Sequence, residues 1–336
     1  MDLITGGTGI VGVHMLLERT AAGVPVRALF RKGSERSIVE RVFLHYRSDA
    51  DELLQRIEWV EGDVLDTGAL RAAMTGISHV YHAAALVSFD PRDADELQNV
   101  NAKGTANVVN AALDAGVARL CHVSSTAAIG RAPGLIERDE QLPWNRDKQV
   151  SDYAVSKYEA ELEVQRGIAE GLDAVIVNPC IVLGPGASGR SSMPMVERLA
   201  RGTAFYPPGS NSVVDARDVA ACMVALMERG ASGERYLLVG ENLSYETLFT
   251  ELALAFGRTP PSRKLQPWML SVASRLERIR SLITRRRPLV TKHTVHSALI
   301  KRAYSNKKVS DLLGYRFRSA REAVANVAGF VKGLEV

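Results

Sequence analysis

The sequence predicts an α/β fold in which helices wind around both faces of a parallel sheet, followed by a smaller, mostly helical lobe. Short apolar segments alternate with amphipathic ones from residue 2 to residue 179, and strands that alternate with helices are typical of a parallel sheet. A glycine-rich turn stands directly after the first apolar segment. Beyond Pro179 the alternation loosens, which indicates a second lobe built from the last part of the chain.

Six segments have the length and apolar content of strands, and they occupy residues 2–5, 25–30, 57–63, 79–85, 119–125 and 173–179. An amphipathic stretch over 96–116 predicts a helix that stops at Gly116. Later, residues 215–229 have a helical period and 235–239 resemble a strand. We therefore assign residues 1–178, together with about 213–240, to the sheet domain. Residues 179–212 and 241–336 are assigned to a substrate-binding lobe.

The composition is that of an ordinary globular chain, with 46% hydrophobic and 24% charged residues and no run of about 18 apolar residues. The first strand begins at Asp2, so we expect no signal peptide before the fold. Cys121, Cys180 and Cys222 are widely spaced and odd in number, which predicts neither a disulfide framework nor a metal site. A cytoplasmic protein with small, buried cysteines is the expectation.

One late segment makes the protein basic. Residues 263–308 hold 13 Lys and Arg and one acid, whereas the rest of the chain has 29 basic and 37 acidic residues. No aromatic-rich basic motif accompanies these charges, so nucleic acid is not an expected partner. Within the segment, apolar residues recur at helical spacing over 267–288 between arginines. Such a helix packs on the lobe or lies weakly on an anionic membrane surface, and both readings stay open.

The glycine-rich turn has the spacing of a dinucleotide-binding turn. In "TGGTGIVG", glycines at three-residue intervals permit a tight turn and let backbone N–H groups approach a pyrophosphate at a helix N-terminus. A turn without a ligand is the alternative. The context of a strand before and a helix after favours a Rossmann-type cofactor site. Its predicted residues are Gly6, Thr8, Gly9, Ile10, Val11 and Gly12.

The end of the second strand favours NADP(H) over NAD(H). An NAD protein carries an acid about 20 residues after the glycines, where it binds the ribose 2′-hydroxyl. Phe30 stands there instead, followed by Arg31 and Lys32, whose cations suit a 2′-phosphate. A solvated basic loop is the alternative reading, and NAD(H) remains the second choice.

Two further strand ends supply candidate cofactor contacts. Asp63 and Val64 follow the third strand, where an adenine could lie against them, while Asp66 is expected to cap the next helix. Small residues end the fourth strand and would let backbone pass close to a cofactor, although plain close packing explains them equally well. These residues are Ala83, Ala84 and Ala85.

"YAVSK" places Tyr153 and Lys157 one helical turn apart. Side chains at this interval project from one face, so the ammonium could stabilise a phenolate. A tyrosine with an unperturbed pKa near 10 could then exchange protons near neutrality. By itself the spacing is also typical of an ordinary solvated helix face.

Taken together, the motifs resemble those of the extended short-chain dehydrogenases/reductases, in the NAD(P)-dependent epimerase/dehydratase group. The resemblance covers nearly the whole chain and is closest to the dihydroflavonol-reductase-like and 3β-hydroxysteroid-dehydrogenase-like branch. The motifs that carry it, in the family's order, are "TGGTGIVG", "GDV", "HAAA", "NAKGT", "VSST", "YAVSK", "NPCIVLGPG", "VVDARDVA" and "LLGYRFRS".

The resemblance implies a catalytic site. The family's tyrosine and lysine fall on Tyr153 and Lys157, its serine on Ser125, and its structural or relay asparagine on Asn101. Tyr153 would pass the proton, Lys157 would lower the pKa of Tyr153 and bind the nicotinamide ribose, and Ser125 would orient the substrate oxygen. Further implied cofactor contacts are Ser124, Pro179, Ile181 and Val182.

The leading expectation is an NADP(H)-dependent oxidoreductase that interconverts a carbonyl and an alcohol on a small, apolar substrate. The alternative is a nucleotide-sugar epimerase or dehydratase with tightly bound NAD(P). The chain reads "NPCIVLGPG" and lacks the later asparagine that helps those enzymes hold a sugar-nucleotide phosphate. Residues 86–91 and 186–194 are the expected walls of the substrate site, and a homodimer is compatible with the resemblance.

Overall fold

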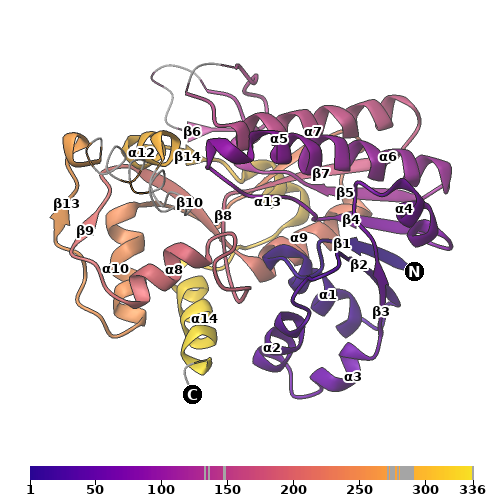
Figure 1. The fold of residues 1–336 in the computed structure, drawn as a ribbon, viewed down its shortest axis with the longest axis horizontal. Coiled ribbons are helices and arrows are strands. Elements are labelled where there is room, and N and C mark those ends of the chain that lie inside the picture. Colours follow the sequence, from indigo (N-terminus) through magenta and orange to yellow (C-terminus); the bar gives the residue numbers. More distant parts are fainter. Residues whose placement is uncertain are drawn as a thin grey trace.

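A seven-stranded sheet forms the centre of the molecule (Figure 1). The computed structural model describes residues 1–131, 134, 137–146, 149–270, 272, 277, 280 and 291–334. The strand order is β11-β7-β5-β4-β1-β2-β3, and all six pairings are parallel, which confirms the predicted fold class. The strands are β1 (Asp2–Thr5), β2 (Val26–Phe30), β3 (Ile57–Glu61), β4 (His79–His82), β5 (Arg119–Val123), β7 (Ala174–Pro179) and β11 (Arg235–Leu238).

Helices cover both faces of this sheet. The face drawn lower in Figure 1 carries α1 (Ile10–Ala21), α2 (Ser37–Tyr46), α3 (Ala50–Leu54) and α9 (Ala216–Arg229). The opposite face carries α4 (Thr67–Met74), α5 (Ala94–Leu97), α6 (Gly104–Asp114) and α7 (Asp152–Ala169). The inner strands therefore bury both faces, because successive side chains point to opposite sides of the sheet, whereas Glu58 and Glu61 of the edge strand β3 are exposed.

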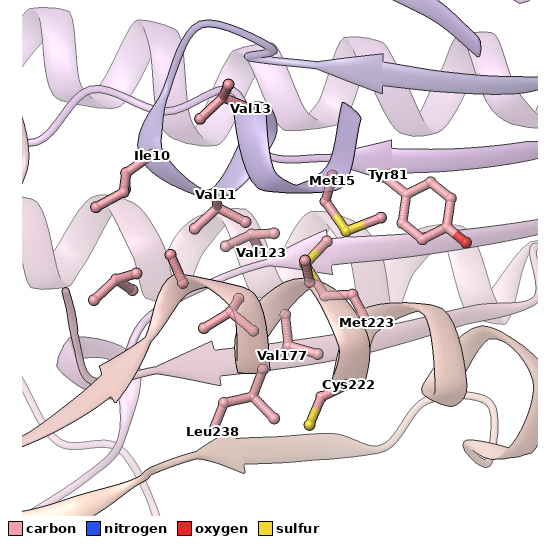
Figure 2. Packing of buried hydrophobic residues seen from close by; sticks show 14 of the residues in the cluster. Ile10, Val11, Val13, Met15, Tyr81, Val123, Val177, Cys222, Met223 and Leu238 are labelled. Atoms are coloured by element: carbon pink, nitrogen blue, oxygen red, sulfur yellow. The ribbon is translucent and has the colours of Figure 1, made fainter. Parts of the chain in front are cut away.

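Figure 2 shows the core on the α1 side. Val11 and Met15 from α1 and Met223 from α9 lie over Val123 and Val177 of the sheet. Burial of one such side chain contributes roughly 1.5–3 kcal/mol, so this layer holds the two helices firmly against the strand ends. Cys121, Cys180 and Cys222 are free and buried, which confirms that they are buried side chains.

The C-terminal part contains a second sheet that the sequence did not reveal. β8 (Ile181–Leu183) pairs in parallel with β10 (Ser210–Asp215), which pairs antiparallel with β12 (Glu241–Ser244). α8 (Met193–Ala200), α10 (Tyr245–Ala255) and α14 (Ala320–Gly333) pack around it. Of residues 213–240, α9 and β11 return to the large sheet, whereas β10 pairs with β8 outside it.

Short elements connect the two parts of the chain. β9 (Phe205–Tyr206) pairs with β13 (Arg263–Lys264), and β6 (Glu137–Arg138) pairs with β14 (Ala303–Tyr304). The remaining elements are η1 (Pro91–Asp93), η2 (Gln98–Lys103), η3 (Thr126–Ala128), α12 (Lys292–Leu299) and α13 (Lys307–Leu313). β6 and β14 thus bring a loop that follows β5 next to the C-terminal third of the chain.

Two helices predicted over 96–116 and 267–288 differ from the structure or lie largely outside its described residues. The helix expected over 96–116 is wrong in detail, because residues 98–103 form the π-helix η2 between α5 and α6. Most of the amphipathic stretch 267–288 lies outside the described residues, and Trp268 within it is exposed. Across the described ranges, no helix combines the length and apolar content needed to cross a bilayer.

Candidate functional site

The glycine-rich turn is built so tightly that side chains would not fit. Gly6 has a positive φ of 72°, and the Gly9 N–H donates to the Gly6 carbonyl over 2.9 Å. A Cβ on Gly12 would lie 2.1 Å from the Gly6 oxygen, and one on Gly6 would lie 2.6 Å from the Ala84 nitrogen. The first turn of α1 carries no acid. The N-terminus of α1 is thus open to an anionic group, as a pyrophosphate site requires.

The other residues predicted at this turn lie where the strands end. Thr8 is half-buried, and Ile10 and Val11 begin α1 with buried side chains. The Ala84 N–H donates to the Thr5 hydroxyl over 3.2 Å, which fixes the end of β4 beside β1. Ala83 and Ala84 are half-buried and Ala85 is exposed. The positions of these alanines therefore agree both with plain close packing and with contact to a cofactor.

A hollow of about 550 Å³ lies at the ends of β2 and β3. Arg31 and Lys32 are exposed at its wall, and Arg190 reaches it from the loop after β8. Arg190 was not among the predicted cofactor residues, although its loop was expected to wall the substrate site. The lining residues are Arg31, Lys32, Gly33, Ser34, Glu61, Gly62, Asp63, Asp66 and Arg190.

Carboxylates share this hollow with the cations. Asp66 caps α4 by accepting from the N–H groups of Gly68 and Ala69, which confirms that prediction. Asp63 accepts from the Leu65 N–H over 2.9 Å. Val64 lies buried against Gly104, where an added Cβ would come within 2.7 Å of its Cγ2. Asp63 and Val64 thus stand at the carboxyl edge where they were expected.

Beside the end of β5, Ser125 and Tyr153 meet. The Ser125 hydroxyl accepts from the Ala127 N–H over 3.1 Å. Burial raises the pKa of Tyr153, while the nearby Ser125 hydroxyl opposes that shift. Phe89 presents its ring edge-on to Tyr153 at 5.7 Å between centroids. Tyr153 therefore lies near the Ser125 hydroxyl and in contact with an apolar ring.

Lys157 lies one turn further along α7 and is almost completely buried. Its ammonium donates to the Val123 carbonyl over 2.7 Å. Burial lowers the pKa of Lys157 to about 8, and the charge of Glu161 raises it in part. The structure shows this ammonium bonded to backbone rather than to Tyr153. Lowering of the tyrosine pKa by Lys157 accordingly stays a prediction for the cofactor-bound protein.

Glu161 is a buried carboxylate that the sequence did not single out. The Asn178 amide donates to Glu161 over 2.5 Å and to the Ser125 carbonyl over 3.0 Å, and the Arg235 guanidinium lies 3.5 Å from the carboxylate. Burial raises the pKa of Glu161. Glu161 thus acts on the Lys157 ammonium through its charge and is joined through Asn178 to the backbone of Ser125. The signal that could have revealed it is the i, i+4 spacing of Lys157 and Glu161 on one helix face.

Asn101 ties three elements together. Its side chain donates to the Leu86 carbonyl over 3.0 Å and to the Ser156 hydroxyl over 2.9 Å, and it accepts from the Leu86 N–H over 2.8 Å. It lies in η2, and π-helical turns often occur at functional sites. Asn101 thus holds the loop after β4 against α7, which fits the structural role implied by the resemblance.

Two buried histidines lie in register on neighbouring strands near Lys157. His82 bonds Thr5 over 2.7 Å and Thr105 over 3.0 Å, while neither ring nitrogen of His122 has a hydrogen-bond partner. Burial lowers the pKa of His82 to about 3 and that of His122 well below its usual value, and the Lys157 charge adds to both shifts. Both rings are therefore neutral at physiological pH.

The remaining predicted residues stand at the ends of β5 and β7. Ser124 is buried, and its N–H donates to the Val177 carbonyl over 2.8 Å. Pro179 is the last residue of β7, after which the chain leaves the large sheet. Val182 is buried and Ile181 half-buried in β8. The ends of β5 and β7 open toward the same edge of the large sheet, since parallel strands end on one side, and β8 follows in the smaller sheet.

Comparison with known proteins matches this chain to one family and to several relatives. A family model described as NAD dependent epimerase/dehydratase family matches residues 3–239. A Synechocystis sp. protein provisionally named dihydroflavonol 4-reductase is 30% identical over 345 residues, which covers 98% of this chain and 95% of that protein. Cinnamoyl-CoA reductase 1 of Oryza sativa subsp. japonica is 32% identical over 273 residues, 78% of either chain.

A solved structure is similar over almost the whole length. The crystal structure of gox2253 superposes with a TM-score of 0.81 at 30% identity and covers 99% of this chain and 98% of its own. These matches confirm the resemblance to the epimerase/dehydratase group and to its dihydroflavonol-reductase-like branch.

Proposed function

Since the chain belongs to the NAD dependent epimerase/dehydratase family and is an NAD(P)-dependent oxidoreductase of the extended short-chain dehydrogenase/reductase type, we propose that it interconverts a carbonyl and an alcohol with NADP(H). One observation carries this proposal. Ser125 lies near Tyr153 and opposes the rise of the Tyr153 pKa, and Lys157 lies one turn further along the same helix with its ammonium on the Val123 carbonyl at the end of β5.

Each of the three residues has a distinct task in the reductive direction. NADPH, when bound, supplies the hydride that reduces the carbonyl carbon. Ser125 donates a hydrogen bond to the carbonyl oxygen and stabilises its developing charge. Tyr153 transfers its phenolic proton to that oxygen, and the ammonium of Lys157 stabilises the tyrosinate that remains. Oxidation of the alcohol reverses these steps.

The choice of cofactor rests on the end of β2. Phe30 stands where an acid would bind a ribose hydroxyl, and Arg31 and Lys32 line the adjoining hollow. The guanidinium of Arg36 lies over the Phe30 ring at 4.6 Å, which adds a third cation to this edge. These positive charges support NADP(H) as the preferred cofactor, with NAD(H) as the alternative.

The reacting part of the substrate is proposed to be small and apolar. Val87 and Phe89 are exposed hydrophobic residues on the loop after β4, and Phe89 touches Tyr153. An apolar group bound there would place its carbonyl next to the tyrosine hydroxyl. The cations at the hollow support NADP(H) and therefore a reductase that consumes it. They do not favour nucleotide-sugar epimerisation, in which the cofactor stays oxidised between turnovers.

The test is a Tyr153→Phe variant assayed with NADPH against ketones, aldehydes and nucleotide sugars. We expect turnover to fall by about 10² to 10⁴-fold, because one positioned proton donor is removed without a change of ring volume. Tyr158→Phe is the matched control, since Tyr158 lies on the same helix and stacks on Trp144 at 4.1 Å. Near-normal activity of Tyr153→Phe would place the acid elsewhere. A nucleotide sugar that isomerises without net NADPH consumption would favour the epimerase alternative.

A further inference from the structure

The hollow at the ends of β2 and β3 takes part of its wall from the C-terminal part of the chain. Arg31 and Lys32 stand directly after β2, whereas Arg190 belongs to the loop of residues 184–192 between β8 and α8. All three side chains are exposed. The volume of about 550 Å³ is typical of a site for a small molecule. Cations from two distant segments therefore line one site of suitable size.

None of these three cations is neutralised by a carboxylate. In the described part of the chain, no hydrogen bond or ion pair involves any of the three side chains. Of the carboxylates that line the same hollow, Asp66 caps α4, Asp63 accepts from a backbone N–H over 2.9 Å, and Glu61 is exposed. The guanidinium of Arg190 therefore keeps its donors for an anion that enters the hollow.

The backbone next to Arg190 forms a defined turn. Across the described ranges, Ser191 is the one residue other than glycine with a positive φ, at 53°. Such a conformation is uncommon and persists where the surroundings enforce it. The Arg190 N–H donates to the Ala187 carbonyl over 3.3 Å, and the Arg190 carbonyl accepts from the Met193 N–H over 3.0 Å. The turn leaves the Arg190 side chain at the wall of the hollow.

The same loop touches two other parts of the predicted cofactor site. A Cβ on Gly186 would lie 3.5 Å from the Cβ of Ile10, the first residue of α1 after the glycine-rich turn. The Ser192 hydroxyl donates to the carbonyl of Val182, an implied cofactor contact in β8, over 2.5 Å. One loop thus runs from the start of α1 to the hollow at the end of β2 and back to β8.

NADP(H) carries anionic groups for both charged places along this path. Its pyrophosphate belongs at the N-terminus of α1, and its 2′-phosphate is the group that distinguishes it from NAD(H). A phosphate monoester carries a charge of about −1.5 to −2 at pH 7, so a single guanidinium does not balance it. Arginine binds phosphate in a bidentate manner. A second guanidinium at the hollow therefore suits the 2′-phosphate.

We propose that Arg190 binds the 2′-phosphate of NADP(H) together with Arg31 and Lys32, so that a residue outside the nucleotide-binding strands helps to select the cofactor. This inference rests on the proposed function, because it assigns NADP(H) to the hollow at the end of β2. Residues 186–194 are also an expected wall of the substrate site. Through Arg190 the 2′-phosphate thus holds that wall in place.

The experiment is calorimetric titration of two nucleotides that differ only in the 2′-phosphate, adenosine 2′,5′-bisphosphate and 5′-AMP. Arg190→Gln is expected to weaken the bisphosphate by about tenfold or more and to leave 5′-AMP within about twofold of wild type. Arg198→Gln is the matched control, because Arg198 is exposed on α8 and does not line the hollow. Thermal unfolding without nucleotide identifies a variant with a folding defect.

The role of the loop is tested by Ser192→Ala, which removes the hydrogen bond to the Val182 carbonyl. This change is expected to reduce the preference for the bisphosphate when Arg190 is present and to have no further effect in Arg190→Gln, because the anchor acts by placing the guanidinium. Equal losses in both backgrounds would show that the loop does not position Arg190.

Unchanged affinity of Arg190→Gln for the bisphosphate, or an equal loss for both nucleotides, overturns the proposal. If Arg31→Ala abolishes the preference while Arg190→Gln retains it, the NADP(H) assignment stands and this inference alone fails. A wild type that binds both nucleotides equally overturns the two together. The titration needs no turnover, so a protein that selects the bisphosphate through Arg190 but reduces no carbonyl contradicts the proposed reaction and supports this site.

Discussion

Lys157 illustrates how one buried side chain can control the pH range of the reaction. Its pKa is lowered to about 8 by burial, and Glu161 is the neighbour that raises it. The ammonium loses its proton as the pH rises through this value. In the unfolded chain the lysine keeps its proton up to about pH 10.5. The folded protein therefore becomes more stable as the pH rises from about 8 to 10.5, because Lys157 loses its proton in the folded protein before it does so in the unfolded chain.

Removal of the Glu161 charge should therefore move the alkaline limit of activity. We expect the rate of wild type to fall above about pH 8 and Glu161→Gln to shift this limb to lower pH, because the variant loses the interaction that raises the pKa of Lys157. The pH profile of kcat/KM measures the shift. Glu159→Gln, two residues away on the same helix, is the control. A profile that is identical in both variants would contradict a role for Glu161 as a positioning residue.

Arg31 is expected to discriminate between the two cofactors. Arg31→Ala should weaken NADP(H) by roughly 1.5–3 kcal/mol, the range for a hydrogen bond to a charged group, with little effect on NAD(H). Fluorescence titration of both cofactors measures the difference. Arg41→Ala is the control, since Arg41 pairs with Glu35 outside the hollow. Equal affinities of the wild type for both cofactors would exclude the NADP(H) preference.

At the level of elements, η2 determines how the loop after β4 meets α7. A regular α-helix would carry Asn101 on a different face, and the wider π turn lets its amide reach both Leu86 and Ser156. The same loop carries Phe89 to Tyr153. A local irregularity in one helix thus shapes the wall of the proposed substrate site.

Asn101→Ala should damage both stability and activity. Loss of the amide leaves the Leu86 N–H and carbonyl without their partner, at a cost of roughly 1–3 kcal/mol. Urea unfolding measures this loss, and kcat reports displacement of the loop. Asn110→Ala on the exposed face of α6 should change stability by about 0.5 kcal/mol or less. Full activity in Asn101→Ala would show that the loop holds its place without the amide.

Over the whole molecule, neutral histidines in the core should make the fold sensitive to acid. Burial lowers the pKa of His14 to about 4 and that of His82 to about 3, and the pKa of His122 lies well below 6.5. Below about pH 6.5 the unfolded chain binds protons that the folded chain excludes. Stability consequently falls as the pH drops through this range.

His122→Phe is expected to reduce that sensitivity. Each excluded proton contributes about 1.36 kcal/mol per pH unit, so the variant should lose about that much less stability for each unit below pH 6.5. Denaturant unfolding at several pH values measures the slope. His293→Phe is the control, because His293 is only half-buried and lies on α12. Parallel slopes for wild type and His122→Phe would show that this ring is not a source of acid instability.

The sequence by itself determined the parallel sheet, the glycine turn and the cap at Asp66. These features depend on residues close together in the chain. Hydrophobic period follows from the geometry of a single strand or helix, the turn needs glycine where a Cβ would strike the Gly6 carbonyl, and a cap bonds N–H groups two and three residues away. The pair Tyr153 and Lys157 was visible for the same reason, since one helical turn separates them.

Only the tertiary structure decided how distant segments combine. Glu161 of α7 meets Asn178 of β7, the three strands of the small sheet come from residues 181–244, and Arg138 of β6 lies opposite Tyr304 of β14. No periodicity within a segment encodes such pairings, because they depend on which strand edge another part of the chain reaches. Whether a charged side chain stays in solvent or is buried is likewise a property of the folded chain. Arg138 is only 8% exposed, whereas Arg31 is exposed, and nothing in the neighbouring residues of either distinguishes them.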